Sequence, residues 1–166
     1  AMVVPAVVTD SGGSEPSDAL SLSMVELLGD EVVSNPVTLA KLKADVLSGR
    51  EGDGTGIDVA LIDSGVAPVA GLDGDNVRPG PDLSGEAAFP QVAYLDSYGH
   101  GTHMAGIIAG QRSGERGLAP GARIVSVKVA GRDGVTSVGQ VVAGIDWVVE
   151  HRNSDGLNIR VLNLSL

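Results

Sequence analysis

Residues 57–66 of the chain have the sequence IDVALIDSGV. The first six residues form a short, mainly apolar run, which is typical of a strand buried on both faces of a parallel sheet. Asp63 follows this run directly. Because ligands in open α/β sheets bind beyond the carboxyl ends of the strands, Asp63 stands where a working carboxylate is expected. The alternative interpretation is a simple turn residue, since Asp-Ser-Gly is ordinary turn chemistry.

Strand-like and helix-like segments alternate after this run. Surface loops are predicted for residues 64–91, which are rich in Gly, Pro and Asp. A helical pattern begins at His100, and the pattern of strands recurs at residues 123–129 and 159–166. Ser137 and Gln140 form a capping box that opens a second helix, over residues 137–150. This order implies βαβ crossovers, and hence a three-layer α/β fold with a mainly parallel sheet flanked by helices.

His100 lies in the stretch GHGTHMAG at residues 99–106. The glycines on both sides let the backbone approach another segment closely and leave the imidazole uncrowded. Along the following helix, Met104, Ile107 and Ile108 share one face, and small residues permit close packing. The alternative interpretation is a capping histidine or a hydrogen-bonded core histidine. The whole octapeptide is nevertheless much more specific than a lone histidine.

Composition excludes several classes of protein. The chain has 166 residues, 43% of them hydrophobic but only 2% aromatic, so its core must consist of aliphatic side chains. Its net charge of −10 repels phosphate backbones, so nucleic acid is an unexpected partner. No apolar run of membrane-spanning length occurs, and the first residues do not have the pattern of a signal peptide. The absence of cysteine excludes disulfides and thiolate metal sites and is compatible with export.

Four segments together resemble the subtilases, the family of subtilisin-like serine peptidases. These are ALIDSGV at residues 60–66, GHGTHMAG at 99–106, GLAPGA at 117–122 and VLNLSL at 161–166. They occur in the family's order and cover roughly residues 50–166. The resemblance predicts a subtilisin-like fold and a secreted or extracytoplasmic protein. It divides the chain into a lead-in segment at 1–50, partly helical, and the N-terminal portion of a peptidase domain at 51–166.

The resemblance implies a serine endopeptidase that uses an Asp-His-Ser triad. Asp63 would orient His100, and His100 would act first as general base and then as general acid. The order of Asp before His is that of subtilisin rather than chymotrypsin. A polypeptide substrate would bind as an added strand between two backbone segments, which here are Gly134-Val135-Thr136 and Ser165-Leu166. A plain surface turn is the alternative interpretation of residues 131–134.

The nucleophile motif of the family, Gly-Thr-Ser-Met/Ala, does not occur in this sequence, and the family's oxyanion Asn is missing as well. We therefore expect this chain to be inactive alone and to need the C-terminal remainder of its domain as a partner that supplies the serine. Because Leu166 lies within the last predicted strand, we also expect an unpaired strand edge there. The alternative is a degenerate subtilase fragment that binds a peptide or a partner without cleaving it.

Metal chemistry is a weaker alternative. His100, His103 and Asp63 could form a two-histidine, one-carboxylate site, but no His-Glu-x-x-His motif is present. Structural calcium is common in subtilases, and Asp73, Asp75 and Asp82 are candidate carboxylates, although their spacing does not fit an EF-hand. The family's calcium loop is shortened here to residues 111–117, so no metal ligand is assigned. Catalysis by the triad requires no cofactor.

Overall fold

The computed structural model describes residues 52–114 and 116–165, together with the backbone of residues 6–9. The strands are β1 (Ala6–Thr9), β2 (Asp58–Asp63), β3 (Val77–Asp82), β4 (Arg123–Lys128) and β5 (Ile159–Leu164). The helices are the short 3-10 helix η1 (Glu86–Ala88), α3 (His100–Ala109) and α4 (Val138–His151). The strands form one sheet in the order β1-β5-β2-β4-β3, in which β3, β4, β2 and β5 are parallel.

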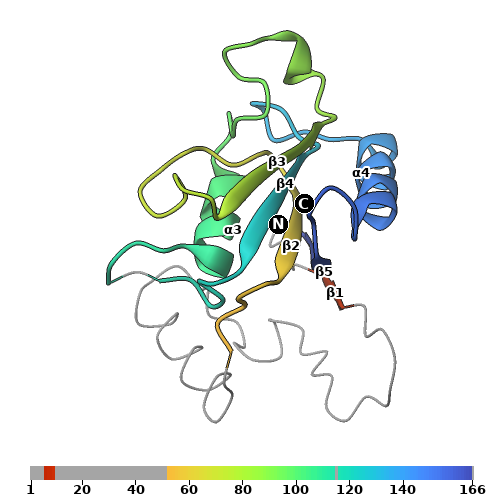
Figure 1. Ribbon diagram of the computed structural model, residues 1–166. Coiled ribbons are helices and arrows are strands. Elements are labelled where there is room, and N and C mark those ends of the chain that lie inside the picture. The colour runs from red at the N-terminus through yellow and green to blue at the C-terminus, as the bar shows by residue number, and fades with distance from the viewer. Residues whose placement is uncertain (1–5, 10–51, 115, 166) are drawn as a thin grey trace, which may run out of the picture.

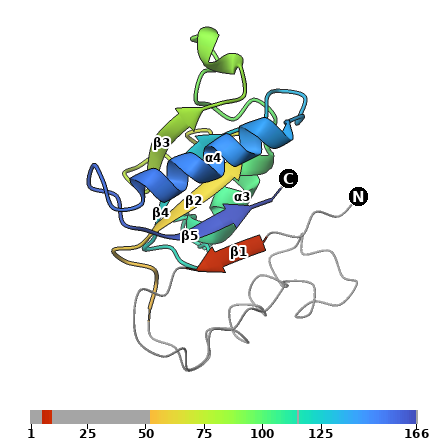
Figure 2. The ribbon, with the colours of Figure 1, turned by 90° about the vertical axis from the view of Figure 1, so that its right-hand side faces the viewer.

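Strand β2 lies at the centre of the sheet, and all six of its residues are buried. Val59 and Leu61 pack with α3 on one face, whereas Ala60 and Ile62 pack with α4 on the other. Successive side chains of a strand point to opposite faces, so an uninterrupted apolar run fits a strand covered on both sides. Figures 1 and 2 show the two helices on opposite faces of the sheet. The predicted three-layer α/β fold with a mainly parallel sheet is confirmed.

The small residues of α3 pack closely on the sheet, as the sequence predicts. Gly101, Ala105 and Ala109 are the buried residues of this helix, and Met104 and Ile108 pack against the core from partly buried positions. The small side chains bring the helix backbone close to the sheet, because a large side chain there would hold it away. This close approach fixes the distance between the start of α3 and the end of β2.

Strand β3 was not expected, because residues 64–91 predict loops. Its sequence, VRPGPD, contains Pro79 and Pro81, which cannot donate to a ladder. The strand lies at the edge of the sheet, where prolines are tolerated, and its pairing with β4 shifts register between Pro79 and Asp82. The loop prediction is therefore wrong for residues 77–82, and the position of the strand at the edge explains why its pattern is irregular.

The outer edge of β5 is paired. Strand β1 runs antiparallel to it, with Ala6 opposite Leu164 and Thr9 opposite Val161. The expectation of an unpaired edge along residues 159–166 is therefore wrong for β5, because residues from the N-terminal segment complete its hydrogen-bond ladder (Figure 2). Apart from the backbone of residues 6–9, the predicted lead-in segment at 1–50, with its expected helices, lies outside the described residues.

The predicted capping box at the start of α4 is present. The Ser137 side chain accepts a hydrogen bond from the Gln140 backbone N–H, and the Gln140 side chain accepts one from Ser137 N–H. These two bonds satisfy donors that have no partner within the helix. Within residues 52–114 and 116–165, neither α3 nor α4 has the length and apolar character needed to cross a bilayer.

Candidate active site

Asp63 and His100 are in contact. Nδ1 of His100 lies 2.9 Å from both carboxylate oxygens of Asp63. Asp63 is the last residue of β2, and His100 is the first residue of α3. The two residues thus meet at the carboxyl edge of the sheet, where the sequence places them. The Asp63 side chain is 3% exposed, whereas that of His100 is 40% exposed. The carboxylate is therefore enclosed, and the imidazole is open to solvent on its other side.

The absence of a side chain at Gly101 allows the contact between Asp63 and His100. A Cβ atom added to Gly101 would overlap the carbonyl oxygen of Gly65 and lie 3.1 Å from Oδ1 of Asp63. Only glycine at this position lets α3 begin against the turn that follows β2. Gly99 precedes the helix in the left-handed conformation, with a φ of 107°. The two glycines of the Gly-His-Gly motif therefore set the entry angle of the helix and its close approach to the Asp63 turn.

The Asp63 carboxylate is held by further donors. Ser64 N–H donates to Oδ1 at 2.7 Å. Burial raises the pKa of Asp63 above its ordinary value, while the hydrogen bonds from His100 and Ser64 act in the opposite direction. A buried carboxylate that faces an imidazole favours the tautomer with the proton on Nδ1 and stabilises the imidazolium form. Nε2 of His100 forms no hydrogen bond with any described residue, so it is available for proton transfer.

Asp96 connects the segments that carry this pair. It accepts hydrogen bonds from the Ser64 hydroxyl at 2.9 Å, from Gly99 N–H at 2.7 Å and from Thr102 N–H at 2.8 Å. Burial acts to raise the pKa of Asp96, but the hydrogen bonds that its carboxylate accepts outweigh burial and lower this pKa. The bond from the Thr102 hydroxyl has the largest effect among them. A charged carboxylate at the start of α3 also suits the positive end of the helix dipole.

Gly134-Val135-Thr136 and Ser165, the predicted substrate-binding residues that the structure describes, lie at the same end of the sheet as Asp63. Gly134-Val135-Thr136 belong to the loop after β4, and the backbone N–H of Val129, at the start of this loop, donates to the carbonyl of Asp63 at 2.8 Å. Val135 is 66% exposed, and the ring of Tyr98 lies against Gly134. The Thr136 hydroxyl is buried without a hydrogen-bond partner among the described residues.

Ser165 follows β5, on the other side of β2. The residue is 2% exposed, and its hydroxyl accepts a hydrogen bond from the Asn163 side chain at 2.8 Å. The residue as a whole is therefore enclosed, and its contact with a substrate stays a prediction. Leu166 lies outside the described residues.

Two of the three carboxylates considered for calcium, Asp73 and Asp82, bind groups of the chain itself. Asp73 accepts from Gly71 N–H at 3.2 Å, and Asp82 accepts from Ser84 and from Tyr94 N–H. In the described part of the chain, no group of three or more His, Cys, Asp or Glu side chains is arranged so that it could hold a metal ion. His103 is exposed on α3. The metallohydrolase alternative therefore has no ligand set there.

Three charged residues near the site were not found by sequence reasoning: Lys128, Glu86 and Asp96. Lys128 ends strand β4, whose interior is mainly apolar, and is 1% exposed. A lysine in such a run is a usable signal, because a buried ammonium group requires a partner. Glu86 and Asp96 lie in the loop between β3 and α3, where the sequence has no periodicity that could reveal them.

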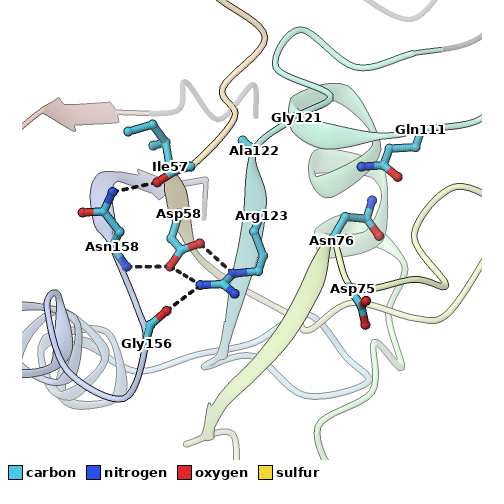
Figure 3. A pocket seen from close by; sticks show the side chains of 11 residues that line it. Ile57, Asp58, Asp75, Asn76, Gln111, Gly121, Ala122, Arg123, Gly156 and Asn158 are labelled. Atoms are coloured by element: carbon cyan, nitrogen blue, oxygen red, sulfur yellow. Dashed lines mark hydrogen bonds and ion pairs between the residues drawn. The ribbon is translucent and has the colours of Figure 1, made fainter.

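A cavity of about 590 Å³ lies at the amino ends of the strands, opposite the end that carries Asp63 and His100 (Figure 3). At its wall, Arg123 binds both oxygens of Asp58, at 2.7 and 2.8 Å, and also donates to the carbonyl of Gly156. Asn158 N–H donates to the same carboxylate at 2.7 Å. Asp58 begins β2 and Arg123 begins β4. Their hydrogen bonds to each other therefore hold the amino ends of the two strands together.

Comparison with known proteins identifies the family. The model of the subtilase family matches residues 54–166. A subtilisin-like protease of Coccidioides posadasii is 42% identical over 68% of this chain and 27% of its own length. Subtilisin E of Bacillus subtilis is 33% identical over 80% of this chain and 32% of its own length.

A solved structure, that of a cold-adapted subtilisin-like serine proteinase, superposes with a TM-score of 0.53 at 32% identity. The match covers 62% of this chain and 35% of that one. The chain thus spans about a third of the length of the relatives that it matches. It belongs to the subtilase family of subtilisin-like serine proteases.

Proposed function

We propose that this chain supplies Asp63 and His100 to the catalytic triad of a subtilisin-type serine endopeptidase. The observation that carries the proposal is the contact of 2.9 Å between Nδ1 of His100 and the enclosed carboxylate of Asp63. In this role Asp63 keeps the proton of the neutral imidazole on Nδ1, which leaves Nε2 free to accept another proton.

The chemistry follows from this arrangement. A serine hydroxyl is a weak nucleophile until a base removes its proton. Nε2 of His100 would take that proton as the serine oxygen attacks the substrate carbonyl, and Asp63 would stabilise the resulting imidazolium. His100 would then give the proton to the leaving amine, so one imidazole serves both halves of the transfer.

We propose that the serine comes from the C-terminal remainder of the same catalytic domain, because the sequence contains no nucleophile motif of the family. The open side of His100, 40% exposed, is where this serine would approach. A segment that joined the sheet beside β5 would have to displace β1, which occupies that edge.

The proposed substrate is an extended polypeptide that pairs with the backbone of Gly134-Val135-Thr136. The support for this assignment is that the segment lies at the edge of the sheet that carries Asp63, and that Val135 is largely exposed. Pairing of this kind adds a strand by main-chain hydrogen bonds, so it accepts many sequences.

The experiment that tests the function mixes this chain with a second chain that carries the remainder of the domain. Cleavage of an unstructured protein substrate by the mixture, and its loss in a His100→Ala variant, would support the proposal. Binding of peptide without cleavage would instead favour a partner-binding module. Cleavage by residues 1–166 alone would contradict the assignment of the nucleophile to another segment.

A further inference from the structure

Lys128 is a buried cation next to the proposed catalytic pair. In the sheet it pairs with Asp63, one strand away. Its ammonium group donates to the carbonyls of Ser64, at 2.8 Å, and Leu95, at 2.7 Å, and forms an ion pair with Glu86 at 3.0 Å. Removing one partner of a buried ion pair leaves an uncompensated buried charge, which strongly destabilises the folded protein. Glu86 is therefore the group that makes a charged lysine tolerable at this edge of the sheet.

The carboxylate of Glu86 holds three segments at once. Oε1 accepts the Arg132 backbone N–H at 3.0 Å, and Oε2 accepts the Ser97 hydroxyl at 2.7 Å in addition to the Lys128 ammonium. The hydrogen bond from Ser97 is the main reason why the pKa of Glu86 lies below its ordinary value. Glu86 belongs to η1, in the segment that projects from the end of the sheet in Figures 1 and 2.

The loop at residues 131–136 depends on this carboxylate. Its other hydrogen bonds are internal: Gly134 N–H donates to the carbonyl of Gly131, and Val135 N–H donates to the side chain of Asp133. Among the described residues, the bond from Arg132 to Glu86 is the only hydrogen bond that joins residues 131–136 to another part of the chain. Glu86 thus fixes the loop relative to the sheet.

We propose that Glu86 is a positioning residue that sets the substrate-binding segment Gly134-Val135-Thr136 in register with Asp63 and His100. The proposal rests on the function proposed above and extends it to the placement of the substrate. The segments that carry Asp63 and His100 are held by other hydrogen bonds, which Ser64 makes with Asp63 and Asp96. Loss of Glu86 should therefore weaken the binding of extended substrates more than it slows the chemical step.

A first measurement needs no catalysis. Hydrogen exchange of the Arg132 amide, followed by NMR on this chain, should become about tenfold faster in Glu86→Ala, because a bond to a charged acceptor is lost. Glu86→Gln retains an oxygen that can accept this amide, so its exchange should stay near that of the wild type. Glu150→Ala, a change at an exposed position on α4, is the matched control and should leave the Arg132 amide unchanged.

A second measurement uses the full-length protein that carries the nucleophilic serine. For an extended peptide, Glu86→Ala should raise KM about tenfold and change kcat less than about twofold. For a single-residue ester, which is too short to pair with residues 134–136, KM should not change. A merely structural role would lower the unfolding temperature of both Glu86 variants without separating the two substrates.

The results separate this inference from the function on which it rests. A wild-type protein without peptidase activity would overturn the proposed function, while the exchange of the Arg132 amide would still decide whether Glu86 holds the loop. Active wild type combined with unchanged Arg132 exchange in Glu86→Ala would overturn the positioning role alone. Equal increases in KM for the long and the short substrate would overturn it too, since the effect would then not act through the loop.

Discussion

The hydroxyl of Ser64 donates to the carboxylate of Asp96 at 2.9 Å and so joins the turn after β2 to the segment before α3. The same hydroxyl accepts the backbone N–H of Gly101 at 3.0 Å. Asp63 precedes Ser64, and His100 precedes Gly101, so this link holds together the two segments that carry the proposed catalytic pair. The alignment of the pair therefore depends on a carboxylate that touches neither of its members.

Asp96→Ala should lower the free energy of unfolding by about 2–3 kcal/mol, because the first turn of α3 and the Ser64 hydroxyl lose a charged acceptor. Urea denaturation followed by circular dichroism measures this change. Asp146→Ala, at an exposed position on α4, is the control and should alter the unfolding free energy by less than about 0.5 kcal/mol. Equal effects of the two variants would show that Asp96 does not support the helix.

Asp63→Asn tests the direction of a pKa shift. Burial raises the pKa of Asp63 above 3.8, so the folded chain binds this proton more tightly than the unfolded chain. The contribution of Asp63 to stability should then become less favourable as pH rises from about 3.8 through the raised pKa. The unfolding free energy of Asp63→Asn minus that of the wild type should increase over this range and level off above it.

Urea denaturation of both proteins between about pH 3.5 and 7 measures that difference. A difference that falls as pH rises would contradict the account. It would mean that the donors around the carboxylate lower its pKa by more than burial raises it.

Two glycines of α3 should respond oppositely to alanine. Gly101→Ala would place a methyl group against the Gly65 carbonyl, so it should destabilise the chain by about 2 kcal/mol or more and separate Asp63 from His100. A Cβ on Gly106 meets no atom within 4 Å, so Gly106→Ala should be neutral or stabilise by up to about 1 kcal/mol through helix propensity. Thermal unfolding of both variants measures the contrast, and similar losses in the two would refute the proposed close approach.

Sequence patterns predicted those elements that obey simple periodicity. The buried run of β2 and the capping box of α4 are local signals, and the structure has both. The close packing of α3 was also predictable, because the small residues Ala105 and Ala109 are the ones buried against the sheet. Strand β3 was not predicted, because prolines interrupt its pattern and only its pairing with β4 makes it a strand.

The residues of the candidate site likewise divide into those that a local sequence motif reveals and those that it does not. Asp63 and His100 stand in short motifs, so the sequence alone names them. Lys128, Glu86 and Asp96 interact through contacts between segments far apart in the chain, and no local pattern records such contacts. The pairing of β1 with β5 likewise joins residues from opposite ends of the sequence, so it could not be predicted from either segment alone.

The most direct test of the central claim is the rate at which a fluorophosphonate labels the nucleophilic serine of the full-length protein. His100→Ala is compared with His103→Ala, which changes an exposed histidine of the same helix. If His100 is the general base, its loss should slow labelling by about 10⁴-fold, while His103→Ala should label within about twofold of the wild type. Labelling of His100→Ala within about tenfold of the wild-type rate, or of a serine within residues 1–166, would contradict the account.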